Sequence, residues 1–127
     1  MKLAYTRLVT KDVTVLARFY QEILGIAPIG SEDYAELRTC GSTLAISSKR
    51  SVDLFNAGAA EAAANHSVIL DFQVADVDRE RSRIIEFVGK FVLEPKDQPW
   101  GNRSMLFRDP DGNLINFFTS IRRALIQ

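Results

Sequence analysis

Hydrophobic and polar positions follow two different periods along the chain, and the same order of periods occurs twice. Apolar residues recur every three to four positions over 14–24 and 78–88, which predicts two amphipathic helices. Alternating or continuous apolar runs rich in β-branched and aromatic residues predict strands. These runs cover 3–10, 34–38, 43–47, 67–75, 91–94, 103–108 and 113–119. Each half of the chain therefore begins with a strand, continues with a helix and ends with further strands.

The faces of these elements predict where the core lies. In the first helix Val15, Leu16, Phe19, Ile23 and Leu24 are expected to face inward, and Phe19 in particular to be core. In the second helix the inward residues are Ile84, Ile85 and Val88. Strand alternation places Val68, Leu70, Phe72 and Val74 on the face that meets the helices.

The two halves resemble each other in sequence. A shift of 64 residues brings Asp12 onto Asp76 and Gly25 onto Gly89. Each aspartate precedes a predicted helix, where its side chain can cap the first turn, and each glycine follows the helix, where a left-handed residue is favoured. The shift grows to 71 residues in the later strands, and the seven extra residues fall within 92–104. The sequence therefore predicts two copies of one module.

The predicted module boundaries leave one joining segment. We expect a single domain over 1–127, with module one over about 1–52, module two over about 66–121 and a tail over 122–127. Residues 53–65 join the modules, and their alanine-rich composition predicts either a short helix or a mobile linker. Residues from 120 onward are expected to pack as an extra turn.

Three segments carry a resemblance to a known family: DV…FYQEILGI over 12–26, DFQVADVD over 71–78 and DPDGNLINFF over 109–118. Together they resemble the vicinal oxygen chelate superfamily, which contains glyoxalases, bleomycin-resistance proteins and extradiol dioxygenases. The resemblance covers nearly the whole chain. It implies an α+β fold in which two tandem βαβββ modules form a curved, partly open eight-stranded mixed sheet around a cavity, within a homodimer. It indicates the fold more than the function, because one fold hosts many chemistries.

The same resemblance bears on metal binding. In metal-dependent relatives the ligands come from the first and last strands of each module, and these positions are Tyr5, Ala45, Ile69 and Asn116 here. None is His or Glu, and a neutral amide is a poor substitute for a carboxylate on a divalent ion. We therefore expect no metal and no other cofactor. Glu36 is interpreted as a charge on a rim or turn.

Asp109 and Asp111 are spaced like a pair of metal ligands. They stand beside Pro110 and Gly112, however, and Asp-Gly supplies the geometry that a tight hairpin turn needs. Both aspartates are therefore interpreted as turn formers.

Strand alternation places aromatic, apolar and hydrogen-bonding groups on the face that would line a cavity, and this mixture suits an organic ligand. The candidate ligand-binding residues are Tyr5, Arg7, Asp71, Gln73, Trp100, Asn116 and Phe118. The shift of 64 residues relates Arg7 to Asp71, so the two could form a salt bridge or could each meet a polar ligand group. The only catalytic candidate is Asp71, a weak one, which would act as a general base. Trp100 is expected either to stack on the ligand or close the mouth of the cavity, or else to pack in a dimer interface or cap the core.

The amino-acid composition restricts which partners and which cellular compartment we expect. Sixteen basic and sixteen acidic residues give no net charge, which argues against nucleic acid or an anionic membrane as a partner. Cys40 is the only cysteine, so no internal disulfide forms, and a lone cysteine is usually small and buried. No apolar run approaches the roughly 18 residues of a membrane span. These features predict a cytoplasmic protein.

Three functions agree with these features. The leading hypothesis is a glyoxalase/bleomycin-resistance-like protein without a catalytic metal, which binds a small organic molecule such as an antibiotic or an aromatic metabolite and could confer antibiotic resistance. The alternative is a metal-independent lyase or isomerase that uses Asp71, Tyr5 or Arg7. A third is a structural or regulatory subunit, whose vestigial cavity would be filled by side chains.

Overall fold

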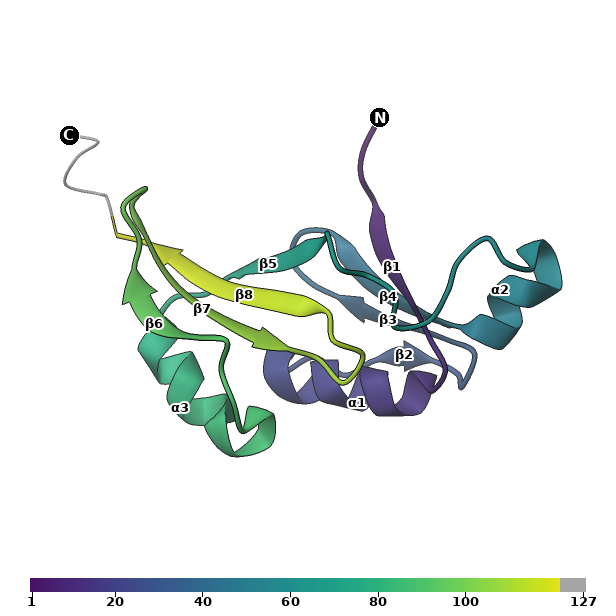
Figure 1. Cartoon of the computed structure of the whole chain (residues 1–127), viewed down its shortest axis with the longest axis horizontal. Coiled ribbons are helices and arrows are strands. Elements are labelled where there is room, and N and C mark those ends of the chain that lie inside the picture. The colour runs from purple at the N-terminus through teal and green to yellow at the C-terminus, as the bar shows by residue number, and fades with distance from the viewer. Residues whose placement is uncertain (122–127) are drawn as a thin grey trace. The chain divides into compact units, whose positions relative to one another are not determined.

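The computed structural model describes residues 1–121 of the chain, so the predicted tail 122–127 lies outside the described residues. The chain divides into two compact units between Ala64 and Asn65, and each unit contains a four-stranded mixed sheet (Figure 1). The eight strands and the helices that follow the first strand of each unit give the α+β architecture expected from the sequence. No helix among the described residues is long and apolar enough to cross a membrane.

The first unit follows the predicted module and adds a short strand and a final helix. Its elements are β1 (Tyr5–Thr10), α1 (Val13–Leu24), β2 (Ile29–Gly30), β3 (Tyr34–Arg38), β4 (Thr43–Ser48) and α2 (Lys49–Asn56). The strand order is β1-β4-β3-β2, with β1 parallel to β4 and the other pairs antiparallel. The helix α2 occupies the boundary between the predicted module one and the predicted linker 53–65, so the short-helix prediction is correct for part of that segment.

The helix α1 begins and ends where the sequence signals predict. The Asp12 carboxylate accepts a hydrogen bond from the Val15 N–H at 3.1 Å, and Gly25 ends the helix with a left-handed φ of 68°. Phe19 is buried, as predicted. Val15, which was expected to face inward, is 53% exposed. Successive residues of a helix are about 100° apart, so Val15 points away from the buried direction of Leu16.

The second unit repeats the arrangement of the first. Its elements are β5 (Ile69–Gln73), α3 (Val77–Val88), β6 (Leu93–Asp97), β7 (Asn102–Arg108) and β8 (Leu114–Ser120), with the sheet order β5-β8-β7-β6. Arg7 pairs with Ala45 in the first sheet, and Asp71 pairs with Asn116 in the second. Adding 64 to 7 and 71 to 45 converts the first pair into the second, so the predicted repeat holds at the level of strand register.

The core of the second unit is built from aromatic side chains on β7 and β8. Phe107 and Phe117 are buried, and their ring centroids lie 5.1 Å apart in an edge-to-face arrangement. Ile84 of α3 is buried, as its helical position predicts. Val68 was expected on this face but is 53% exposed, because the strand starts one residue later, at Ile69.

The turn between β7 and β8 confirms the assignment of Asp109 as a turn former. One oxygen of its carboxylate accepts hydrogen bonds from the N–H groups of Asp111 and Asn113, both at 2.9 Å, and the other accepts from Asn113 Nδ2 at 2.7 Å. Gly112 has a φ of 87°, which suits glycine at this position. The carboxylate is thus used to hold the turn.

Cys40 departs from its expected burial. It lies exposed between β3 and β4, in a polar turn where Thr39 Oγ1 donates a hydrogen bond to the Ser42 carbonyl. The turn places its side chain in solvent, outside the core of the first unit.

Candidate functional site

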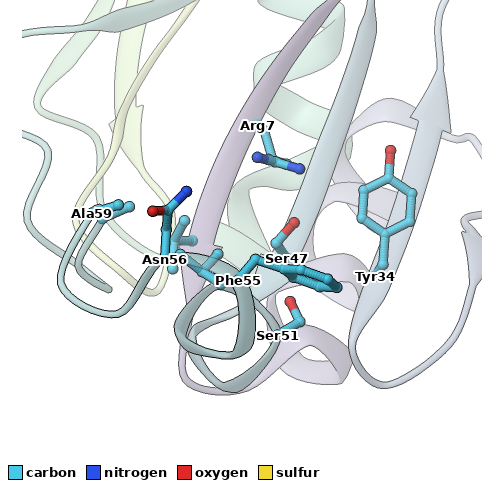
Figure 2. Close-up of a pocket in the computed structure, with 10 residues that line it drawn as sticks. Arg7, Tyr34, Ser47, Ser51, Phe55, Asn56 and Ala59 are labelled. Carbon is cyan, nitrogen blue, oxygen red and sulfur yellow. The ribbon is translucent and has the colours of Figure 1, made fainter.

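A pocket of 640 Å³ opens in the first unit between the sheet and α2 (Figure 2). The sheet contributes Arg7, Val9, Tyr34 and Ser47. The other wall consists of Ser51, Val52, Phe55 and Asn56 of α2 with the following Ala59 and Ala60. The pocket therefore combines aromatic, aliphatic and hydrogen-bonding groups.

The sheet places its pocket residues on one face by register. Val9 pairs with Ser47, and Ser47 pairs with Tyr34, so these three side chains form one row across β1, β4 and β3. Arg7 lies two residues before Val9 and therefore points to the same side. The alternate residues, such as Leu8 and Ile46, are buried in the core. The pocket thus lies on the face that is opposite the core.

Tyr34 is held by a neighbour on its own strand. Its hydroxyl donates a hydrogen bond to Glu36 Oε2 at 2.7 Å, and Arg38 Nε donates to Glu36 Oε1 at 3.0 Å. The bond to Glu36 raises the pKa of Tyr34, and the bonds from Tyr34 and then Arg38 lower the pKa of Glu36. Tyr34 therefore presents a neutral phenol at neutral pH.

The interpretation of Glu36 as a charge on a rim or turn is wrong. Glu36 lies in the middle of β3, and its side chain is only 14% exposed. The pairing of β3 with β4 places it in the same row as Ala45 and Arg7. Its two hydrogen bonds satisfy the carboxylate within the sheet.

The first turn of α2 is attached to the start of β3 through Asp33. The Asp33 carboxylate accepts from Ser48 Oγ at 2.7 Å and from Arg50 Nη2 at 2.8 and 2.9 Å, and the Ser48 N–H donates to the Asp33 carbonyl at 2.9 Å. The Ser48 bond, followed by the Arg50 bond, lowers the pKa of Asp33. Ser48 also caps the helix by accepting from the Ser51 N–H at 3.0 Å. Polar contacts thus fix where the outer wall of the pocket begins.

The end of α2 that carries Phe55 is exposed to solvent. None of its residues is buried, and Phe55 is 86% exposed although it lines the pocket. An aromatic ring in this position offers a surface that a ligand can cover.

The second unit brings together four of the predicted site residues. Asp71 pairs with Asn116 and Gln73 pairs with Phe118, so all four share one face of the second sheet. Asn116 Nδ2 donates to Asp71 Oδ1 at 2.9 Å, while the buried Asn116 Oδ1 has no hydrogen-bond partner among the described residues. Trp100 lies between β6 and β7 and is 58% exposed, so both interpretations of its role stay predictions.

The four positions that the resemblance assigns to metal ligands do not fit a divalent ion. Tyr5 and Ala45 share a face of the first sheet, and Ile69 and Asn116 share a face of the second. The methyl group of Ala45 and the butyl side chain of Ile69 offer no donor atom, and Asn116 offers only a neutral amide oxygen, so the four positions lack the His or carboxylate ligands of a catalytic site. Within residues 1–121 no group of three or more His, Cys, Asp and Glu side chains is arranged to hold a metal ion.

Of the predicted ligand-binding residues, Arg7 lines the pocket, and Tyr5 lies two residues before it on the same face of β1. The predicted contact between Arg7 and Asp71 joins the two units and stays a prediction. The candidate residues predicted from the sequence did not include Tyr34 or Phe55. Pairing 34–38 with 43–47 would have found Tyr34, whereas Phe55 carries no sequence signal that separates it from other residues of a linker.

The paired β-α-β-β-β units define a class of proteins, and comparison with known proteins identifies it. Residues 2–117 match the Glyoxalase/Bleomycin resistance protein/Dioxygenase superfamily. The chain therefore belongs to that family.

Individual proteins resemble this chain in sequence or in fold. The uncharacterized protein YraH of Bacillus subtilis (strain 168) is 29% identical over 93% of this chain and 98% of its own length. A glyoxalase/bleomycin resistance protein/dioxygenase from Nocardioides has a similar structure, with a TM-score of 0.80 and 21% identity over 97% of this chain and 85% of that chain. A family enzyme from Burkholderia phytofirmans PsJN gives a TM-score of 0.82 with 19% identity, over 94% of this chain and 99% of that chain. These two structures bear on the fold alone.

Proposed function

We propose that the protein binds a small organic molecule in the pocket of its first unit. The observation that carries this proposal is the pocket itself, whose 640 Å³ lies within the range of roughly 300–1,000 Å³ typical of small-molecule sites. Its lining combines apolar side chains with a few polar groups that can orient a ligand. A vestigial cavity would instead be filled by side chains, and the open pocket is an argument against that hypothesis.

The two walls of the pocket would contribute different groups to ligand binding. The sheet residues are fixed by strand pairing and supply the polar contacts of Arg7, Ser47 and Tyr34. The helix α2 supplies Phe55, which gains burial when a flat ligand covers it. An aromatic metabolite or an antibiotic with a flat ring system fits this division, so we include antibiotic sequestration in the proposal.

The test is a binding screen on ¹⁵N-labelled protein with aromatic metabolites and with flat and glycosylated antibiotics. We expect at least one compound to bind at micromolar levels and to shift the amide signals of Ser47, Ser51 and Phe55. The variant Phe55→Ala should weaken the binding of that compound. Leu54→Ala is a matched control, because Leu54 is also on α2 and 77% exposed but does not line the pocket.

Two outcomes of this screen would count against the proposal. One is a broad panel in which no compound binds. The other is a compound whose affinity falls equally in Phe55→Ala and Leu54→Ala, because the ligand would then lie outside the pocket.

The proposal includes the homodimer that the family resemblance implies. Native mass spectrometry of the purified protein, with metal analysis on the same sample, should give a dimer without stoichiometric metal. A monomer would contradict the dimer, and one metal ion per chain would contradict the metal-independent binding site.

A further inference from the structure

The pocket carries a single formal charge. Among the ten described residues that line it, Arg7 is the only one with a charged side chain, and no aspartate or glutamate is present. Tyr34 is the other titratable group with a polar atom in the lining, and its raised pKa keeps the phenol neutral at neutral pH. The lining is therefore cationic.

The acidic groups around the pocket are already paired with other residues. Asp33 is bonded to Arg50 and Ser48 at the start of α2. Glu36 is bonded to Tyr34 and Arg38 on β3. These pairings use the carboxylates that would otherwise neutralise a guanidinium on the same face of the sheet.

The repeat explains why Arg7 itself lacks a partner within its unit. Asp71, the equivalent of Arg7, stands beside Asn116, which donates a hydrogen bond to it at 2.9 Å. Arg7 stands beside Ala45, whose methyl group cannot hydrogen-bond. Among the described residues of the first unit, the Arg7 guanidinium makes no hydrogen bond or ion pair. It is left as a donor facing the pocket.

We propose that the pocket selects small organic carboxylates and that Arg7 is the group that binds the carboxylate. This inference rests on the proposed function and specifies its ligand class. A guanidinium matches a carboxylate with two parallel hydrogen bonds, which makes it more selective than a point charge. Figure 2 shows the Ser47 hydroxyl directed toward the guanidinium, where it can add a third donor.

The remaining lining sets the organic part of the ligand. Val9, Val52 and Phe55 are apolar and would contact a hydrocarbon or aromatic body rather than an inorganic anion. Phe55 is 86% exposed, so a ring placed against it removes apolar surface from water. The pocket thus favours an aromatic or aliphatic body with one carboxylate.

Pairs of probes that differ only in charge test this inference. Benzoate is compared with benzamide, and phenylacetate with phenylacetamide, by titration of ¹⁵N-labelled protein. In the wild type we expect each carboxylate to bind about tenfold more tightly than its amide, which is the size expected of hydrogen bonds to a charged group. Arg7→Gln should abolish this preference, and Arg7→Lys should keep part of it. Arg18→Gln removes the same charge from the exposed side of α1 and should leave the preference intact.

The outcomes separate this inference from the proposed function. If carboxylates and amides bind equally well and shift the same pocket signals, the inference fails while the binding function stands. If none of the four probes nor any compound of the broader panel binds, both fail. A preference lost equally in Arg18→Gln would reveal a general charge effect and overturn the role of Arg7. The role of Arg7 would also be overturned if the wild type showed no preference for carboxylates and the variant Asp71→Asn did. In that case Asp71 would already neutralise the charge of Arg7.

Discussion

The Asp109 turn provides a test of what holds the second sheet together. The substitution Asp109→Ala removes the acceptors of the Asp111 N–H, the Asn113 N–H and the Asn113 side-chain amide. Asp109 is 5% exposed and Asn113 is 4% exposed, so water cannot readily replace the lost carboxylate at Asn113. The turn would then contain buried donors without acceptors at the point where β7 turns into β8.

The size of the effect follows from the number of donors affected. Each buried donor left without a partner costs about 1–3 kcal/mol. Asn113 contributes two such donors, whereas the Asp111 N–H lies nearer the surface and can bind water. We therefore expect the free energy of unfolding to fall by about 2–6 kcal/mol, a large share of the roughly 5–15 kcal/mol typical of a whole protein.

Urea unfolding followed by far-ultraviolet circular dichroism measures this loss. Asp111→Ala is the matched control, because the buried Asp111 Oδ2 accepts no hydrogen bond among the described residues. Asp109→Asn should lie between the two, since its amide keeps one acceptor but sets a donor against the Asn113 side chain. The reasoning is refuted if Asp109→Ala and Asp111→Ala have equal stability. A divalent ion that stabilises the wild type would instead support the metal-pair interpretation of these aspartates.

Three further predictions concern the first unit and the core. Gly30→Ala should lower stability by about 2 kcal/mol or more, because a Cβ there overlaps the Tyr34 carbonyl oxygen. At Gly41 an added Cβ makes only an ordinary contact with Thr39 Oγ1 at 3.9 Å, so Gly41→Ala should be neutral in the same urea assay. Hydrogen bonds from Ser48 and Arg50 lower the pKa of Asp33, so its contribution to stability is full above the ordinary value of 3.8 and is lost as the pH falls through the lower folded-state pKa. Asp33→Asn should therefore flatten the acid limb of the stability profile, and an unchanged limb would contradict this. Phe107→Ala should cost about 3–5 kcal/mol in thermal or urea unfolding, since the side chain is fully buried against other aromatic rings.

Most of the fold could be predicted because its signals are local. The helix α1 is marked by a capping aspartate and a terminal glycine within the same short segment, and α3 repeats both marks with Asp76 and Gly89. The offsets of 64 and 71 residues then predicted which residues of the two modules are equivalent, and these residues occupy equivalent register positions in the two sheets. Signals of this kind need no knowledge of tertiary contacts.

The elements that were missed or only partly predicted are either very short or fixed by tertiary contacts. The strand β2 has only two residues, too few for any alternation to be seen. The helix α2 has no buried residue, and the attachment of its first turn comes from Asp33, which lies 17 positions before Arg50 in the sequence. Nothing in the composition of 53–65 distinguishes the part that is helical from the part that is not. The outer wall of the pocket was therefore outside the reach of sequence reasoning.

The two modules carry different side-chain pairs at one equivalent position of their sheets. The same register position holds Arg7 beside Ala45 in one unit and Asp71 beside Asn116 in the other. The Asn116 amide donates one hydrogen bond to Asp71, whereas the Ala45 methyl group offers none to Arg7, which has no hydrogen bond or ion pair among the described residues of its unit. A charged residue in a sequence is therefore not by itself a sign of a ligand site. The neighbour on the adjacent strand decides whether a charged side chain is bonded within the sheet or available to a ligand. In the first unit the available charge is that of Arg7, which lines the pocket between the sheet and α2.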